Sequence, residues 1–593
     1  MSLHPVEKRP SLVNSSWLPV AIILAASLIL SIPLFRDGLP FAHDTEEHLE
    51  RYICFATQFS NGELYPRWLA NANGGLGSPV MFVYAPLAYY VPTVLRPLLH
   101  FPLDGAKESR EIGVSMWLAL AVSGLTAFWW LKSFVNRNAV AALGALLYMA
   151  MPYHLTIDLY TRAAVAEMWA FAWLPLILYF ESTAIRTRAR SAMAGFAVSY
   201  GLLIFTHLLT ALIFTPIVIA APWFLAKSGN RWFALRQISL LLALGIGLSA
   251  AYLAPALQHE KDVSPDRLAQ FRPTLSYSRN FMALSRSGAE PGSRGDFVWK
   301  VSWITLSTAA AAIAALALKG RLKNVNTQDL FWAAVAAVSL VMMFPISKLV
   351  WHAVPQLSAI QFPYRFNTLL AIATIALLSS AMDSLTRPFR AWRLITASGI
   401  AALLLLWAVT DVRMIRSLRP GKLRSQPLLS ETPNGLDVLL PGWSQAKNPQ
   451  FLRQLGILEL SRQAAVRGAG VTTASLDRRS AREIELTEDG SQGWVTLPLL
   501  FYPGWSAKAE NGSKLNIRAV PDNGLVELEM PAGLNRVQLT LPPGSGEKLG
   551  IASSAICVLL VLILLTEGFW RRRKTFHEMD EGEARLAESG QLH

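Results

Sequence analysis

Long apolar runs separated by short polar segments dominate the chain. The runs contain about 17 to 20 mostly apolar residues, the length that a helix needs to cross a hydrocarbon core of roughly 30 Å. We therefore predict a polytopic α-helical membrane protein with about twelve transmembrane helices. The predicted spans lie at 17–35, 112–131, 139–157, 163–180, 192–206, 207–225, 238–257, 301–318, 330–346, 366–382, 394–410 and 549–567.

Basic residues indicate how these spans are oriented. With twelve spans and a cytoplasmic N-terminus, each of the seven cytoplasmic segments carries Lys or Arg, as the positive-inside rule expects. A single long helix over 192–225 is the alternative to two spans in that region. It would move the basic clusters on one side of that point to the wrong face of the membrane, so we predict two spans.

Composition and charge agree with a membrane protein. Of the 593 residues, 52% are hydrophobic and 16% are charged, which is too apolar for an ordinary soluble protein. Much of the net charge of +14 lies in the predicted cytoplasmic segments, so it gives no support to nucleic-acid binding. The two cysteines, Cys54 and Cys557, are far apart in sequence and imply no disulfide framework. No small-residue cleavage site follows the first span, so we expect that helix to be retained.

One long segment near the C-terminus has a different pattern. REIELTED (482–489) and LVELEM (525–530) alternate apolar and charged residues, and Asn511-Gly512 is a turn signal. This pattern predicts a small β-sandwich, acting either as a lid or in glycan binding. The predicted organisation is a cytoplasmic N-terminus at 1–16, a transmembrane domain at 17–410 with a large extracytoplasmic loop at 36–111, an extracytoplasmic β-rich domain at 411–548, a final helix at 549–567 and a cytoplasmic tail at 568–593.

The stretch FAHDTEEHLERY (41–52) places four carboxylates and two histidines just beyond the first span. On a helix, the i, i+3, i+4 and i+7 spacing aligns one set of these groups on a single face. That set is Asp44, Glu47, His48 and Arg51. Glu46 and Glu50 fall on other faces, where we expect them to be solvated. A solvated helix with a Glu47–Arg51 ion pair is the alternative, although ionisable groups beside a bilayer tend to line functional cavities.

The other short extracytoplasmic segments also hold isolated polar groups. These are Arg162 and Glu167 in DLYTRAAVAEMW, His207 in FTHLLT and Arg365 in QFPYRF. Such groups gathered on one leaflet suit a site where an anionic lipid headgroup meets a hydroxyl-rich substrate. Guanidinium binds phosphate oxygens bidentately, and we prefer Arg365 because Arg162 could simply pair with Glu167. The alternatives are snorkelling for Arg365 and ordinary hydrogen bonding or packing for the two histidines, His48 and His207.

The apolar segment MFVYAPLAYYVPTVL (81–95) is interrupted by Pro86 and Pro92, so we predict a re-entrant or interfacial element and not a span. Tyr84 in this segment could stack on a sugar, or belong to an interfacial aromatic belt. The preceding glycines in NANGGLGSPV (71–80) lack the spacing of a phosphate-binding loop and predict a tight turn.

Several of these stretches together resemble a known family. HDTEEHLERY, LYPRWLANANGGLGSPVMFVYAPLAYY, YTRAAVAEMWAF, FTHLLTALIF and QFPYRF are similar to the bacterial multispanning family labelled 6-pyruvoyl-tetrahydropterin synthase-related. FYPGWSAKAENGSKL is similar to the C-terminal region of YfhO-like membrane proteins, and both groups resemble the GT-C fold of type C glycosyltransferases. The zinc-binding histidines of the soluble pterin enzyme have no counterpart here.

The resemblance implies a function. It implies a glycosyltransferase of a bacterial inner membrane, with its active site on the extracytoplasmic side, that moves a sugar from a polyprenyl-phosphate-linked donor to a glycan, lipid or protein acceptor. An acidic residue shortly after the first span acts as the general base or helps to bind a metal in such enzymes, and Asp44 occupies that place. Glu47 would then assist, and Asp44, Glu47 and His48 are the residues that could hold a divalent cation. The alternative is a transporter or flippase of lipid-linked glycans.

Overall fold

The computed structural model describes residues 17–102, 106–260, 275–285, 290, 293–385, parts of 398–413 and most of 466–566. The predicted N-terminus at 1–16, the tail at 568–593 and part of the predicted span at 394–410 lie outside the described residues. The main helices are α1 (Trp17–Leu30), α2 (Ile32–Asp37), α3 (Thr45–Ser60), α4 (Val80–Val83), α5 (Leu87–Leu95), α6 (Lys107–Lys132), α7 (Asn138–Met149), α8 (Val165–Thr187), α9 (Arg190–Thr206), α10 (Leu208–Leu225), α11 (Arg231–Leu248), α12 (Ala250–Gln258), α14 (Arg294–Arg321), α15 (Thr327–Met342), α16 (Lys348–Ala353) and α17 (Asn367–Ser384).

The described residues confirm a polytopic helical membrane protein. Within the described ranges, eight helices are long and apolar enough to cross a membrane, and α15 with the segment after it, bent by 89°, makes a ninth if the two are counted as one span. The first predicted span is the 14-residue α1, which ends before Ser31 and continues as the short α2. The two helices predicted for 192–225 are separate and meet at His207.

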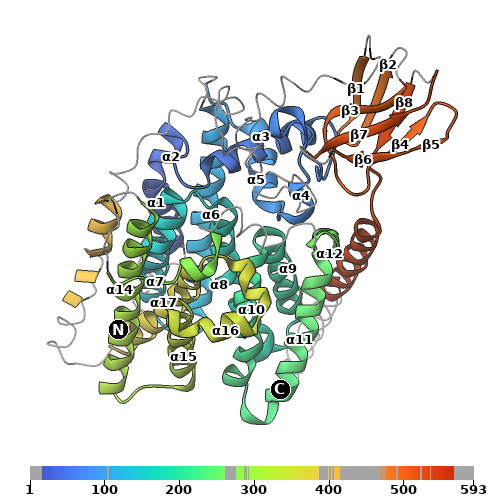
Figure 1. The fold of residues 1–593 in the computed structure, drawn as a ribbon. Helices are drawn as coiled ribbons and strands as arrows, with labels where there is room; N and C mark the ends of the chain where they lie inside the picture. The colour runs from blue at the N-terminus through green and yellow to red at the C-terminus, as the bar shows by residue number, and fades with distance from the viewer. Residues whose placement is uncertain are drawn as a thin grey trace, which may run out of the picture.

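The segment at 36–111, predicted as the first large loop, is folded and carries the three helices α3, α4 and α5. Within the segment at 81–95, α4 and α5 are too short to cross a bilayer, as its two prolines predicted. Figure 1 shows α3, α4 and α5 together at one end of the helix bundle, next to the β strands. This end of the bundle therefore presents a folded surface, which the site described below uses.

Two antiparallel sheets form the β-rich region and confirm the predicted fold class. One has the order β1-β2-β8-β4-β5 and the other the order β3-β7-β6. The sheets enclose a core of apolar side chains that includes Leu486, Val526 and Leu539. The strands are β1 (Ala474–Ser480), β2 (Glu483–Glu488), β3 (Gly493–Leu500), β4 (Ser506–Ala509), β5 (Lys514–Leu515), β6 (Ile517–Ala519), β7 (Leu525–Met530) and β8 (Arg536–Thr540).

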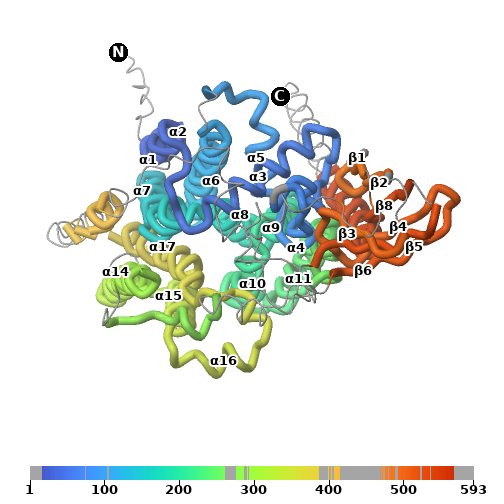
Figure 2. Tube along the Cα trace, turned by 45° about the horizontal axis from the view of Figure 1, so that its top comes forward, coloured from blue at the N-terminus to red at the C-terminus, as the bar shows by residue number. Residues whose placement is uncertain are grey.

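The first loop and the β strands share one hydrophobic core. Trp68 is fully buried and packs edge-on against Trp505, with ring centroids 5.5 Å apart. Phe82 at α4 stacks on Tyr502 at 5.2 Å. Figure 2 shows α4 beside β3 from a second direction. Because aromatic contacts of this kind bury large areas, they fix the β strands against the first loop.

Candidate functional site

Arg162 lies at the centre of a buried cluster of charged side chains. Its guanidinium contacts three carboxylates, at 2.6 Å from Asp158, 2.8 Å from Glu167 and 3.6 Å from Asp44. Arg365 Nε lies 3.4 Å from Glu167 on its other side. Burial alone would lower the pKa of Arg162, but Glu167 and Asp158 outweigh it and raise that pKa, so Arg162 stays charged.

The carboxylates of this cluster differ in their access to solvent. The Asp158 and Glu167 side chains are 0% and 2% exposed, whereas that of Asp44 is 37% exposed. Asp44 therefore forms the rim of the cluster and is the carboxylate that an incoming molecule reaches.

Unusual backbone geometry positions these groups. A π-helical segment, η4 (Tyr153–Thr161), ends directly before Arg162, and such segments are rare and frequent at functional sites. The next residue, Ala163, has a φ of +52°, in the left-handed region that costs a non-glycine residue about 1 kcal/mol or more. The backbone N–H of Asp44 donates to the carbonyl of Arg162 at 3.0 Å, which joins the first loop to this turn. Gln361, four residues before Arg365, also has a positive φ of 62°.

Helix α3 forms one wall beside the cluster. His48 Nδ1 lies 2.9 Å from the hydroxyl of Tyr89, and Arg51 lies over the Tyr84 ring at 4.9 Å from its centroid. Burial lowers the pKa of His48 to about 4, so this histidine is neutral at physiological pH. Arg51 also pairs with Glu47 at 3.6 Å, the ion pair that the sequence offered as an alternative.

The structure brings the predicted site residues together from separate parts of the chain. Asp44 is the N-cap of α3, Glu167 is in the first turn of α8, and Arg365 precedes α17. His207, between α9 and α10, lies within electrostatic reach of Glu167 and Arg365, and its Nδ1 is 2.7 Å from Thr210 Oγ1. The same cluster therefore includes groups from four separate segments of the chain.

The structure corrects the expectation for Glu50 and decides against the snorkelling alternative for Arg365. Glu50 is not simply solvated, because its Oε1 accepts a hydrogen bond from the backbone N–H of Asn73 at 3.0 Å and so anchors the following turn. Arg365 is 9% exposed and donates to the carbonyl of Ile360 at 2.7 Å. It does not snorkel toward water at a helix end.

Sequence reasoning missed several residues of the cluster. Asp158 sits at i−4 from Arg162 in DLYTR, and that helical spacing was the available signal. Tyr153 donates to Glu167 at 3.2 Å. Arg294, at the start of α14, donates to Asn280 Oδ1 at 2.8 Å and lies over the Phe362 ring, 5.1 Å from its centroid. Arg365 lies 5.0 Å from the centroid of the same ring, so two guanidinium groups contact Phe362.

The described part of the chain contains no group of three or more His, Cys, Asp or Glu side chains that could hold a metal ion. Asp44, Glu47 and His48 do not converge as a ligand set there, and the Nδ1 atom of His48 already contacts Tyr89.

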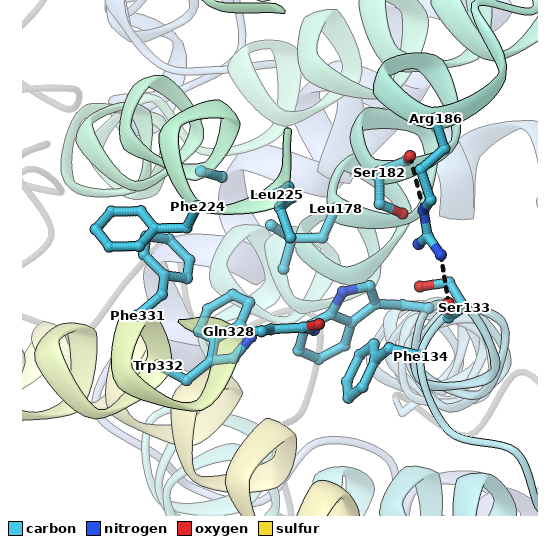
Figure 3. Close-up of a pocket in the computed structure, with 12 residues that line it drawn as sticks. Ser133, Phe134, Leu178, Ser182, Arg186, Phe224, Leu225, Gln328, Phe331 and Trp332 are labelled. Atoms are coloured by element: carbon cyan, nitrogen blue, oxygen red, sulfur yellow. Dashed lines mark hydrogen bonds between the residues drawn. The ribbon is translucent and has the colours of Figure 1, made fainter. Parts of the chain in front are cut away.

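A cavity of about 180 Å³, away from the Arg162 cluster, lies between α6, α8, α10 and α15. Figure 3 shows Phe224, Phe331 and Trp332 on one side of it and Arg186 on the other. Arg186 donates to the carbonyls of Ser133 and Ser182 at 2.7 and 3.2 Å. No carboxylate is among the described residues that line this cavity, so it lacks the acid-base groups of the Arg162 cluster.

Comparison with known proteins identifies the family. Residues 82–419 match the 6-pyruvoyl-tetrahydropterin synthase related domain, described as a membrane protein. The chain belongs to this family. This PTPS-related chain is also 24% identical over 250 residues to an uncharacterized protein of Lactococcus lactis subsp. cremoris (strain MG1363). That match covers 40% of the chain and 39% of the relative.

Two solved structures of arabinofuranosyltransferase AftD from Mycobacteria share a distant likeness with the PTPS-related chain. Both are 17% identical to it. One match has a TM-score of 0.44 and covers 68% of this chain and 28% of AftD; the other has a TM-score of 0.41 and covers 70% and 27%. The chain thus spans little more than a quarter of AftD, and a likeness at these scores assigns neither fold nor substrate.

Proposed function

We propose that the protein is a membrane glycosyltransferase that moves a sugar from a polyprenyl-phosphate-linked donor to an acceptor hydroxyl on the extracytoplasmic side. The observation that carries the proposal is the position of Asp44, a partly exposed carboxylate at the rim of a buried cluster with arginines behind it. This arrangement offers a proton acceptor next to groups that stabilise a phosphate.

The chemistry assigns one role to each kind of group. The acceptor oxygen attacks the anomeric carbon of the donor sugar and forms the new glycosidic bond, while Asp44 takes the proton of the acceptor hydroxyl. The bond between the anomeric carbon and the lipid phosphate breaks, and its electron pair stays on the phosphate oxygen. Nearby guanidinium groups stabilise that charge.

Two arginines are suited to the phosphate. Arg162 is already surrounded by three carboxylates, so its charge is compensated. Arg365 contacts one carboxylate, and Arg294 forms no ion pair within the part of the chain that the structure describes. We therefore assign the phosphate to Arg365 and Arg294, which both lie close to the Phe362 ring.

The test is a transfer assay with the purified full-length protein in lipid nanodiscs. A panel of radiolabelled polyprenyl-phosphate sugars is supplied with membrane extracts as the acceptor source. Asp44→Asn keeps the size of the side chain but removes the base, so we expect transfer to fall by roughly 10²- to 10⁴-fold with unchanged expression and thermal stability.

Glu46→Gln is the matched control, because Glu46 is a neighbouring carboxylate outside the cluster, and it should transfer as well as the wild type. Wild-type rates in Asp44→Asn would remove Asp44 from the mechanism. Movement of the labelled lipid across the bilayer with no sugar transferred would instead favour the flippase.

A further inference from the structure

A polar cleft lies between the C-terminal end of α3 and the hairpin of β1 and β2, at the turn that joins these two strands. Its volume is about 600 Å³, within the range of roughly 300 to 1,000 Å³ that small-molecule sites occupy. The polar side chains lining it are those of Gln58, Asn61, Glu63, Asn71, Arg478, Ser480 and Arg482. It is separate from the Arg162 cluster, since none of its lining residues belongs to that cluster.

The walls of this cleft are fixed to each other. Arg478, at β1, donates to the carbonyl of Ala70 at 2.6 Å and to the carbonyl of Gly75. The backbone N–H of Leu500 donates to the carbonyl of Leu76 at 2.8 Å. Together with the shared aromatic core, these bonds make the cleft a built feature of the junction.

A buried ion-pair network closes the base of the same junction. Glu547, at the start of the last helix, contacts Arg67 at 2.9 Å and Arg482 at 3.2 Å. Both partners are largely buried, with side-chain exposures of 3% for Arg67 and 17% for Arg482. The positive charge of Arg482 is therefore compensated where it meets the cleft.

Two side-chain amides of the cleft, those of Asn61 and Asn71, can still bind a ligand. Gln58 is fully engaged, donating to Glu63 at 2.8 Å and to the carbonyl of Trp68 at 2.9 Å while accepting from the backbone of Ala70 at 2.8 Å. Asn61 and Asn71 are exposed, and within the described ranges their side chains make no hydrogen bond. An amide both donates and accepts, which matches a sugar hydroxyl.

The charges of the cleft favour an uncharged ligand. Glu63 opposes an anion, Arg482 is paired with Glu547, and Arg478 is held by backbone carbonyls. The cleft lies at one end of α3 and Asp44 at the other, and the 16 residues of this helix span about 24 Å. Only an extended molecule reaches both.

We propose that this cleft binds a neutral, hydroxyl-rich glycan chain, and, resting on the proposed function, that this chain is the acceptor whose reacting end extends toward Asp44. Asn61 and Asn71 bind its hydroxyl groups. A short sugar leaves the cleft empty, so acceptor use depends on chain length.

The test is a binding assay with the full-length protein in nanodiscs, carried out without any donor. The probe is an array of neutral, uronate-containing and phosphate-containing oligosaccharides, each in short and long forms. We expect the protein to retain long neutral oligosaccharides, and the double variant Asn61→Ala/Asn71→Ala to bind them at least about tenfold more weakly, because two hydrogen bonds are lost.

Asn511→Ala is the matched control, since Asn511 is an exposed asparagine on the β4–β5 turn that does not line the cleft. Asp44→Asn should bind glycan like the wild type, so a failure of catalysis does not affect this readout. Asn71→Trp, which places a bulky ring at the cleft, should block binding as well. The proposal is overturned if no neutral glycan is retained, if only anionic glycans are retained, or if the double variant binds unchanged.

Discussion

The Arg162 cluster and the ion pair between Lys319 and Asp329 are both buried, but only one of them is complete. Lys319 Nζ contacts Asp329 Oδ2 at 2.7 Å and Ser380 Oγ at 2.8 Å. Ser380 in turn donates to Asp329 Oδ1 at 2.7 Å, and the backbone N–H of Asn326 donates to Oδ2 at 2.9 Å. Each charged atom of this pair has a partner, and both side chains are 3% exposed.

The Arg162 cluster has buried atoms left over. Asp158 Oδ2 and Arg365 Nε are buried without a hydrogen bond to any described residue, although Arg365 Nε lies 3.4 Å from Glu167. Both regions contact α14, whose 28 residues span about 42 Å, with Arg294 at one end and Lys319 near the other. A completed network stabilises the fold, whereas an incomplete one with an exposed carboxylate keeps groups available for a ligand.

The largest predicted loss of stability comes from the completed network. Asp329→Asn leaves the ammonium of Lys319 buried and uncompensated, which costs about 3–5 kcal/mol. We expect a large drop in the unfolding midpoint in nanodiscs, with the transfer rate per folded molecule unchanged.

Asp37→Asn is the control for Asp329→Asn, because Asp37 pairs at 2.7 Å with Arg36 and their side chains are 37% and 76% exposed. An exposed pair of this kind is screened by solvent and contributes little to stability. A loss of transfer in Asp329→Asn with normal stability would show that the comparison between the two regions is wrong.

The sequence alone predicts many of the residues that gather at the candidate site and the segment that forms strands. The positive-inside rule and short loops place Arg162, His207 and Arg365 on one side of the membrane, and a membrane leaves polar groups few other places to gather. The alternation of apolar and charged residues predicts the strands, because each face of a sheet has a different environment.

The pairings inside the cluster could not be predicted. The contact between Asp44 and Arg162 joins segments far apart in sequence, and it depends on a π-helical segment and a positive φ at Ala163 that no apolar pattern encodes. The 89° bend after α15 is likewise invisible to hydropathy.

Acid should weaken the site through His48. The pKa of His48 is lowered to about 4, first by burial and then by Arg51 and Arg162, against an opposing effect of Asp44. The unfolded chain binds a proton at this residue below about 6.5, so it binds more protons than the folded state between roughly pH 4 and 6.5. Stability therefore falls as the pH drops through this window, by up to about 3 kcal/mol from this one residue.

His48→Gln tests this pH dependence. The variant cannot take up the proton, so its unfolding midpoint should decline less than that of the wild type between pH 6.5 and 4, measured in nanodiscs. His100→Gln, at an exposed histidine, should decline like the wild type. Parallel curves for His48→Gln and the wild type would mean that His48 is already charged in the folded protein.

The smallest effect separates the two arginines beside Phe362. Arg294 forms no ion pair among the described residues, whereas Arg365 is shared with Glu167, so the charge of Arg294 is the more available to a phosphate. Arg294→Lys keeps the charge but loses bidentate geometry, and we expect the KM for the lipid donor to rise about tenfold with little change in kcat. Arg279→Lys, at an exposed arginine nearby in sequence, should leave the KM unchanged. If Arg365→Lys raises the KM and Arg294→Lys does not, the donor phosphate binds to the arginine that a carboxylate already holds, and incomplete pairing is not what marks a ligand site in this protein.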